Sequence, residues 1–174
     1  MDRQSIVVGG GCFWCIEAVY RRVDGVLEAE SGYAGGSTVN PTYREVCSAT
    51  TGHAEVVRIT FDAEAISLME ILDLFWGAHD PTTLNRQGAD VGPQYRSIIL
   101  YSDDGQKRAA EQSRAEAANR FDAPIVTEIV PLQTFYRAEE DHQRYYENNT
   151  RQGYCRIVIE PKLRKLGFDS EPRR

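Results

Sequence analysis

The stretch Gly9-Gly10-Gly11-Cys12-Phe13-Trp14-Cys15-Ile16-Glu17 sets the architecture of the start of this 174-residue chain. The run before it, Ser5-Ile6-Val7-Val8, is apolar and β-branched, which predicts a buried strand that the three glycines interrupt. Apolar residues then recur at helical spacing from Cys12 to Val23, with Glu17 on the opposite, polar face. We therefore expect a strand, a glycine turn and a helix in succession.

Cys12 would lie in the first turn of that helix. Unpaired backbone N–H groups and the positive end of the helix dipole favour an anion there, so the thiol is expected to be biased towards the thiolate. The glycine approach would let a substrate come close to the backbone, and the aromatic pair Phe13-Trp14 is expected to be exposed. The alternative is that Cys12 is simply a small buried hydrophobic residue. Cys15, one helical turn later, could form a disulfide with Cys12.

The composition is that of an ordinary globular protein, with 41% hydrophobic and 26% charged residues. This length predicts one domain, residues 1–174, with a basic, solvated tail from about residue 160 that includes Lys162. The net charge of −6 argues against nucleic acid as a partner. From the sequence we expect neither a secretory signal nor an apolar run long enough to cross a bilayer. A cytoplasmic location without membrane association is therefore predicted.

Four cysteines in a reducing compartment favour catalytic, redox or metal roles over structural disulfides. Zinc could be held by Cys12, Cys15, Cys47 and Cys155. Structural zinc sites use paired short spacings, however, and only one such spacing is present. We therefore expect no metal site.

The remaining elements are predicted from periodicity and turn residues. Further strands are expected at 26–33, 53–62, 97–101 and 125–130, helices at 65–78, from Asp103 or Asp104 to about 121, and at 138–149, irregular backbone at 43–52, a functional loop at 80–95, and a β-like segment at 156–159. This order predicts an α+β fold, a two-layer sandwich with helices packed on a mixed sheet.

Glu55 shares one face of the predicted 53–62 strand with Val57, Ile59 and Phe61. Because that face is the more apolar one, Glu55 would point into the core, where burial raises the pKa of a carboxyl group. A carboxyl that is protonated near neutral pH is a candidate general acid. The alternative is that Glu55 lies at the end of the strand and reaches solvent or an arginine.

Five separated motifs resemble those of peptide methionine sulfoxide reductases of the A type. They follow the order and spacing of that family from about Ile6 to Cys155. The motifs are Gly11-Cys12-Phe13-Trp14, Asn40-Pro41-Thr42-Tyr43, Thr51-Gly52-His53-Ala54-Glu55, the stretch from Gln87-Gly88-Ala89-Asp90 to Gln94-Tyr95-Arg96-Ser97, and Gly153-Tyr154-Cys155.

The resemblance implies a ferredoxin-like fold and a set of catalytic roles. Cys12 would attack the sulfur of methionine-S-sulfoxide, and Glu55 would protonate its oxygen, to which Tyr43 and Tyr95 would hydrogen-bond. The substrate's methyl group would lie against Phe13 and Trp14. Asp90 would line the same pocket and hold its polar groups.

Cys12 would be left as a sulfenic acid, which a second thiol must resolve. Many relatives have glycine at the position of Cys15 and resolve through a C-terminal cysteine, whereas this chain offers both Cys15 and Cys155. Cys47 is a third candidate, which we expect to be a bystander. Ala89 and Pro93 also depart from the commonest family residues, which bears on substrate fit rather than on the reaction.

The family further implies a monomer with no bound cofactor and thioredoxin as the electron donor. It implies oxidised proteins, peptides and free methionine sulfoxide as substrates, and a role in protein repair under oxidative stress. The main rival function is general thiol–disulfide exchange by Cys12 and Cys15. That function would leave Glu55, Tyr43 and Tyr95 without a role.

Overall fold

The predicted strand, glycine turn and helix are present in the computed structural model, which describes residues 1–168. Strand β1 (Arg3–Gly9) leads through the glycines to helix α1 (Phe13–Tyr20). A Cβ at Gly9 would lie 2.7 Å from the backbone oxygen of Glu55, and one at Gly11, whose φ is +91°, would lie 2.8 Å from Cγ of Gln87. The glycines therefore let other parts of the chain approach closely, and the approach of a substrate to the backbone at this turn stays a prediction.

The main sheet of the described residues is mixed, as predicted. Its strand order is β7-β6-β1-β3-β2-β8, and only the β6–β7 pair is parallel. The strands that follow β1 are β2 (Val26–Ala34), β3 (Ala54–Asp62), β6 (Ile98–Tyr101), β7 (Glu128–Pro131) and β8 (Tyr136–Arg137). Strands β4 (Arg86–Gln87) and β5 (Asp90–Val91) form a separate hairpin in the loop before β6.

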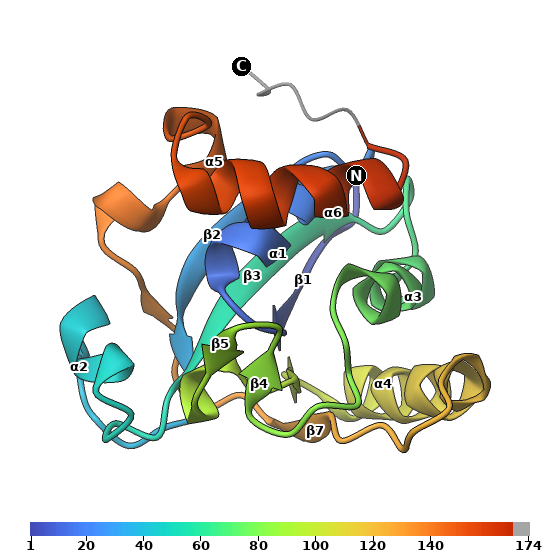
Figure 1. Cartoon of the computed structure of the whole chain (residues 1–174). Coiled ribbons are helices and arrows are strands. Elements are labelled where there is room, and N and C mark those ends of the chain that lie inside the picture. Colours follow the sequence, from blue (N-terminus) through green and yellow to red (C-terminus); the bar gives the residue numbers. More distant parts are fainter. Residues whose placement is uncertain (169–174) are drawn as a thin grey trace.

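Helices pack on one face of this sheet, and the larger core lies between the two layers (Figure 1). Alternate residues of β3, among them Val57, Ile59 and Phe61, point into this core and contact helix α1. The other helices of this layer are α3 (Leu68–Ala78), α4 (Asp104–Ala117), α5 (Tyr145–Asn148) and α6 (Glu160–Lys165). A smaller apolar cluster lies elsewhere on the sheet, where Leu132 and Phe135 contact Val56. The predicted single α+β domain of two layers is thus observed.

Two segments differ from the predictions because of local capping and backbone strain. Residues 43–52, expected to be irregular, contain the short helix α2 (Tyr43–Cys47). Thr42 and Glu45 cap this helix reciprocally. The helix expected at 138–149 is instead a 3₁₀ turn, η3 (Glu140–His142), followed by α5, because Arg144 between them adopts a left-handed conformation with φ of 52°.

The C-terminal segment also differs from the predictions. Residues 155–159 form a π-helix, η4 (Cys155–Ile159), where a β-like segment was expected, and α6 follows directly. Leu163 of α6 is fully buried, so the predicted solvated tail does not begin at residue 160. Arg173 and Arg174 of that predicted tail lie outside the described residues. The longest helix in residues 1–168 is too short and too polar to cross a membrane.

Gly36 offers a test of how tightly the loop before α2 packs on the turn that precedes β3. A Cβ there would overlap backbone atoms of His53 and Gly52, which cannot rotate away, whereas a Cβ at Gly153 would meet nothing within 4 Å. We expect Gly36→Ala to lower the free energy of unfolding by roughly 2 kcal/mol or more, and Gly153→Ala to leave it nearly unchanged. Urea denaturation of both variants measures this. Equal effects would contradict the packing described.

Candidate active site

Cys12 is the N-cap residue of α1 and lines a cavity of about 1050 Å³. Its backbone is extended, with φ of −62° and ψ of 129°, so it lies just before the first helical turn and not within it as predicted. The first helical hydrogen bond runs from the N–H of Cys15 to the carbonyl of Cys12 (3.1 Å). The residue is only 6% exposed, so its thiol is largely removed from water.

Glu55 points from β3 into the core beneath the start of α1. Its Oε1 accepts a hydrogen bond from the backbone N–H of Phe13 (3.2 Å), and its buried Oε2 has no partner within residues 1–168. The side chain is 1% exposed, so the alternative of a solvent-reaching glutamate is wrong. Burial raises the pKa of Glu55 to about 8. The Phe13 N–H opposes that rise, and the charge of Asp90 adds to it. The carboxyl group is therefore mostly protonated at neutral pH.

Burial also decides the state of the Cys12 thiol. Desolvation raises the pKa of Cys12 well above its usual value, and the charges of Glu55 and Cys15 raise it further. The backbone N–H of Trp14 lowers the pKa, which is the helix-start effect that we predicted, but it is the weaker influence. The expected thiolate bias is thus wrong for the unliganded protein, whose resting pair is a neutral thiol beside a neutral carboxyl.

Tyr43 and Tyr95 both converge on this pair. Tyr43 begins helix α2, and Tyr95 ends the 3₁₀ turn η1 (Pro93–Tyr95), which is tied to the glycine turn by a hydrogen bond from the N–H of Gly11 to the carbonyl of Tyr95 (3.2 Å). Burial raises the pKa of each phenol, and the charges of Glu55 and Cys12 raise both further. Both hydroxyl groups are therefore neutral hydrogen-bond donors close to the two reacting groups.

The aromatic pair after Cys12 is only partly as predicted. Phe13 is fully buried, where we had expected it to be exposed, and it packs against Tyr43 with ring centroids 6.1 Å apart. Trp14 is half-buried and stacks on Tyr145 at 3.6 Å. Its indole N–H donates to Nδ1 of His142 (3.2 Å). The wall that the sequence suggested therefore includes Tyr145 and His142, which no motif had indicated.

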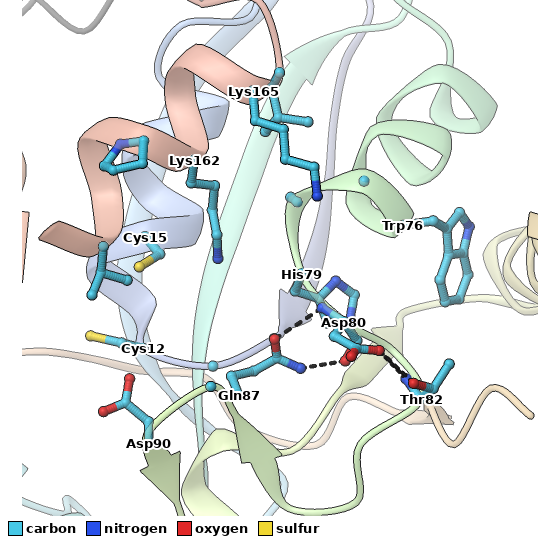
Figure 2. A pocket seen from close by; sticks show the side chains of 18 of the residues that line it. Cys12, Cys15, Trp76, His79, Asp80, Thr82, Gln87, Asp90, Lys162 and Lys165 are labelled. Atoms are coloured by element: carbon cyan, nitrogen blue, oxygen red, sulfur yellow. Dashed lines mark hydrogen bonds between the residues drawn. The ribbon is translucent and has the colours of Figure 1, made fainter. Parts of the chain in front are cut away.

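The thiol of Cys15 is joined to Asp90 through Tyr154. The hydroxyl of Tyr154 donates to Oδ2 of Asp90 (2.9 Å) and lies 3.5 Å from the sulfur of Cys15. Cys12, Cys15 and Asp90 line the cavity together with Tyr154, and Figure 2 shows the two sulfurs and the Asp90 carboxylate on one side of it. Three predicted site residues, Cys12, Cys15 and Asp90, are thus brought together at this cavity, whereas Trp14 and Tyr95 are not among the described residues that line it.

All four cysteines are free thiols. Cys155 is fully buried in η4 near Cys15, whose charge adds to the effect of burial in raising the pKa of Cys155 to about 11. Cys47 is exposed at the end of α2, and Tyr43 hydrogen-bonds to it. Within residues 1–168 no group of three or more His, Cys, Asp or Glu side chains is arranged to hold a metal ion.

Glu17 holds the aromatic wall in place, a role that the sequence did not reveal. Its helical spacing placed it on the polar face of α1, yet it is buried. Its carboxylate accepts hydrogen bonds from the backbone N–H of Arg144 (2.6 Å) and from the hydroxyl of Ser31 (3.2 Å). Arg144 lies between His142 and Tyr145, so this contact fixes the segment that packs on Trp14.

Comparisons with known proteins agree with this geometry. The family described as "Peptide methionine sulfoxide reductase" matches residues 4–172. The chain belongs to the peptide methionine sulfoxide reductase family. A relative from Leptospira borgpetersenii serovar Hardjo-bovis (strain L550), named Peptide methionine sulfoxide reductase MsrA, is 57% identical over 93% of this chain and 92% of its own length.

Two solved structures of Mxr1 from Saccharomyces cerevisiae are similar to this peptide methionine sulfoxide reductase. The reduced form is 34% identical over 88% of this chain and 90% of Mxr1, with a TM-score of 0.85. The form in complex with Trx2 is 26% identical over 81% of this chain and 84% of Mxr1, with a TM-score of 0.61. As a reductase of the MsrA type, this protein is an oxidoreductase.

The raised pKa of Glu55 makes the stability of this reductase depend on pH. The folded pKa of about 8 lies above the unfolded value of 4.5, so the protonated carboxyl favours folding below pH 4.5, and this contribution is lost as the pH rises through 8. We expect the free energy of unfolding of Glu55→Gln to equal that of the wild type near pH 4.5. At pH 8 to 9 it should be larger than that of the wild type by roughly 2–4 kcal/mol. Urea denaturation at both pH values measures the difference. If the two proteins differed in free energy of unfolding by the same amount at both pH values, Glu55 would not be the buried carboxyl with an unpartnered Oε2 described above.

Proposed function

We propose that this protein reduces methionine-S-sulfoxide in proteins and peptides, with Cys12 as the nucleophile and Glu55 as the acid. The observation that carries the proposal is the buried Glu55 carboxyl, with a pKa of about 8, beside the Cys12 thiol. A carboxyl that keeps its proton at neutral pH can donate it to a sulfoxide oxygen, which a carboxylate of ordinary pKa cannot do.

The proton and electron balance of the first step fits these two groups. The Cys12 sulfur bonds to the sulfoxide sulfur while Glu55 gives a proton to the oxygen, and the thiol proton of Cys12 returns to the carboxylate. The protonated oxygen then passes from the substrate sulfur to the Cys12 sulfur as the bond between the two sulfurs breaks, so methionine leaves and Cys12 remains as a sulfenic acid. The sulfoxide is reduced by two electrons, Cys12 is oxidised by two, and Glu55 ends the step protonated again.

The surrounding side chains would bind the substrate. Tyr43 and Tyr95, whose phenols are neutral, would donate hydrogen bonds to the oxygen as negative charge develops on it. The half-buried ring of Trp14 would contact the S-methyl group, and Phe13 would support that ring from below. Asp90, on the cavity wall, would hold polar groups of the site through Tyr154.

Cys15 would be the first resolving thiol. It lies one turn from Cys12, lines the same cavity, and its charge is among the strongest influences on the pKa of Cys12. Cys155 lies next to Cys15 and would act second, by attacking the Cys12–Cys15 disulfide at Cys15 and releasing Cys12. Thioredoxin would reduce the final disulfide, as the complex of Mxr1 with Trx2 suggests.

Several finer properties belong to the same proposal. The core β1-α1-β2-β3-α3-β6 would be ferredoxin-like, which is supported by its antiparallel order β6-β1-β3-β2 with both helices on one face. Free methionine sulfoxide would also be a substrate. The protein would act as a monomer without a bound cofactor, in the cytoplasm, where thiols stay reduced.

Single-turnover chemistry tests the proposal directly. The reduced protein, without added reductant, is mixed with each epimer of a methionine sulfoxide peptide, and its oxidised cysteines are mapped by mass spectrometry. We expect methionine from the S epimer only, with Cys12 in a disulfide. If neither epimer yields methionine while a Cys12–Cys15 disulfide exchanges with other thiols, general thiol–disulfide exchange is the function instead.

Glu55→Gln distinguishes sulfoxide reduction from general thiol–disulfide exchange, because only the first of these needs an acid. A glutamine cannot supply a proton, so methionine formation at pH 7 should fall by about 100-fold or more, because general acid catalysis contributes factors of this size. Exchange of the cysteines with a small disulfide should be unchanged in the same variant. Undiminished sulfoxide reduction by Glu55→Gln would remove Glu55 from the mechanism.

Cys15→Ser tests the order of resolution. With Cys15 first in line, the variant should still form one equivalent of methionine but should accumulate Cys12 sulfenic acid, which a sulfenic-acid-trapping dione detects. Cys155→Ser is the matched control, and it should still form the Cys12–Cys15 disulfide at the wild-type rate. A Cys12–Cys155 disulfide formed quickly in Cys15→Ser would assign the resolving role to Cys155.

A further inference from the structure

A cationic side chain extends into the cavity beside the proposed resolving thiol. Lys162 and Cys15 both line the cavity, and Figure 2 shows the lysine reaching down from α6 between Cys15 and His79. The position of Lys162 is fixed by its neighbours in α6, because Leu163 is fully buried in the core. The prediction that Lys162 belongs to a solvated tail is therefore wrong.

Lys162 forms no salt bridge with a carboxylate of the described residues. None of the salt bridges found in residues 1–168 includes it. Its neighbour His79 is neutral, because burial lowers the pKa of that imidazole to about 4, and its two nitrogens are engaged by the carbonyl of Phe75 and the hydroxyl of Ser97. Lys162 thus brings to the cavity an ammonium group that none of these salt bridges neutralises, and Lys165 and Arg120 also line the cavity.

We propose that Lys162 is a positioning residue that stabilises the anionic form of the Cys15 sulfur and so promotes its attack on the Cys12 sulfenic acid. This inference rests on the proposed function, in which Cys15 resolves first. In the step concerned, a Cys12–Cys15 S–S bond forms and the S–O bond of Cys12 breaks. The oxygen leaves as water with the proton from Cys15, so Cys15 is oxidised and Cys12 is reduced.

The other groups around Cys15 do not provide a positive charge that stabilises its thiolate. Burial raises the pKa of the Cys15 thiol, and the charges of two further groups raise it more, whereas Lys162 and the hydroxyl of Tyr154 lower it, with Lys162 the stronger of the two. The titratable and charged groups that face Cys15 are Lys162 from α6, Tyr154 and Cys155 from the C-terminal segment, Asp90 from β5, Glu55 from β3, and Cys12. Lys162 is the only cation among these groups of the described chain.

Lys162→Met tests the proposal by its pH profile, because methionine keeps the length of the side chain and removes the charge. A lower thiol pKa gives more thiolate but a weaker nucleophile, so the net gain is about threefold for each unit of pKa. We expect disulfide formation after a single turnover to be about three- to fivefold slower than the wild type at pH 7. Raising the pH should speed disulfide formation in both proteins and narrow the difference between them, because the thiolate fraction of Cys15 rises in each.

Matched variants separate charge from structure. Lys162→Arg keeps the cation and should restore the wild-type rate of disulfide formation. Lys165→Met removes the other lysine charge of α6 that lines the cavity, which is not among the charges that shift the pKa of Cys15, and should leave the pH profile unchanged. Methionine formation, which precedes resolution, should be equal in all four proteins. The proposal would be overturned if Lys162→Met slowed disulfide formation by the same factor at every pH. It would also be overturned if the variant formed the disulfide at the wild-type rate at pH 7.

Failure of the proposal can be distinguished from failure of the proposed function. The function fails in the wild-type protein itself, if no methionine forms from the sulfoxide peptide. The role of Lys162 fails only in the comparison of variants, while wild-type turnover remains. A first disulfide in the wild type that joins Cys12 to Cys155 would also overturn the role of Lys162, because the lysine would then face a thiol that does not resolve.

Discussion

The hydrogen bond from the N–H of Phe13 to the carboxyl group of Glu55 is the contact on which the site depends. It joins the first residue of α1 to the middle of the sheet, so the position of Cys12 is set by the register between β1 and β3. Gly9 lets the two strands approach closely here, because a Cβ on it would lie 2.7 Å from the backbone oxygen of Glu55. The glycine turn therefore brings a thiol and an acid together inside the fold.

Placing both groups out of water gives a resting site without charge. Burial raises the pKa of Cys12 and of Glu55, and each group, once ionised, would make ionisation of the other more costly. In the proposed mechanism such a pair would suit a substrate that is itself neutral but strongly polar, since the sulfoxide oxygen would take the Glu55 proton as the Cys12 proton is released. The arrangement stores a proton where the reaction consumes one, and it does not hold a permanent thiolate exposed to oxidants.

The sequence allowed the strand–turn–helix unit and the inward face of β3 to be predicted, because each depends on a short-range period. The same period gave the burial of Glu55 as one of two alternatives. Contacts between distant segments could not be predicted in this way. Glu17 sits at a polar position of its helix and is nonetheless buried, because Arg144, over a hundred residues later, brings a backbone N–H to it. The bias of Cys12 towards thiolate was inferred from the helix start alone, and the desolvation that outweighs it arises only from the packed fold.

The backbone around the three thiols near α1 indicates which of them can move during the reaction. Cys12 precedes the regular helix, and Cys155 lies in a π-helix, whose wider hydrogen-bonding pattern is rare and often occurs at functional sites. Cys15, between them, lies in the regular part of α1 and packs in the core. Disulfide formation requires sulfurs about 2 Å apart, so some backbone must shift. The shift costs least at Cys12 and Cys155, so the helical residue Cys15 would stay in place while each of its two neighbours moves to meet it.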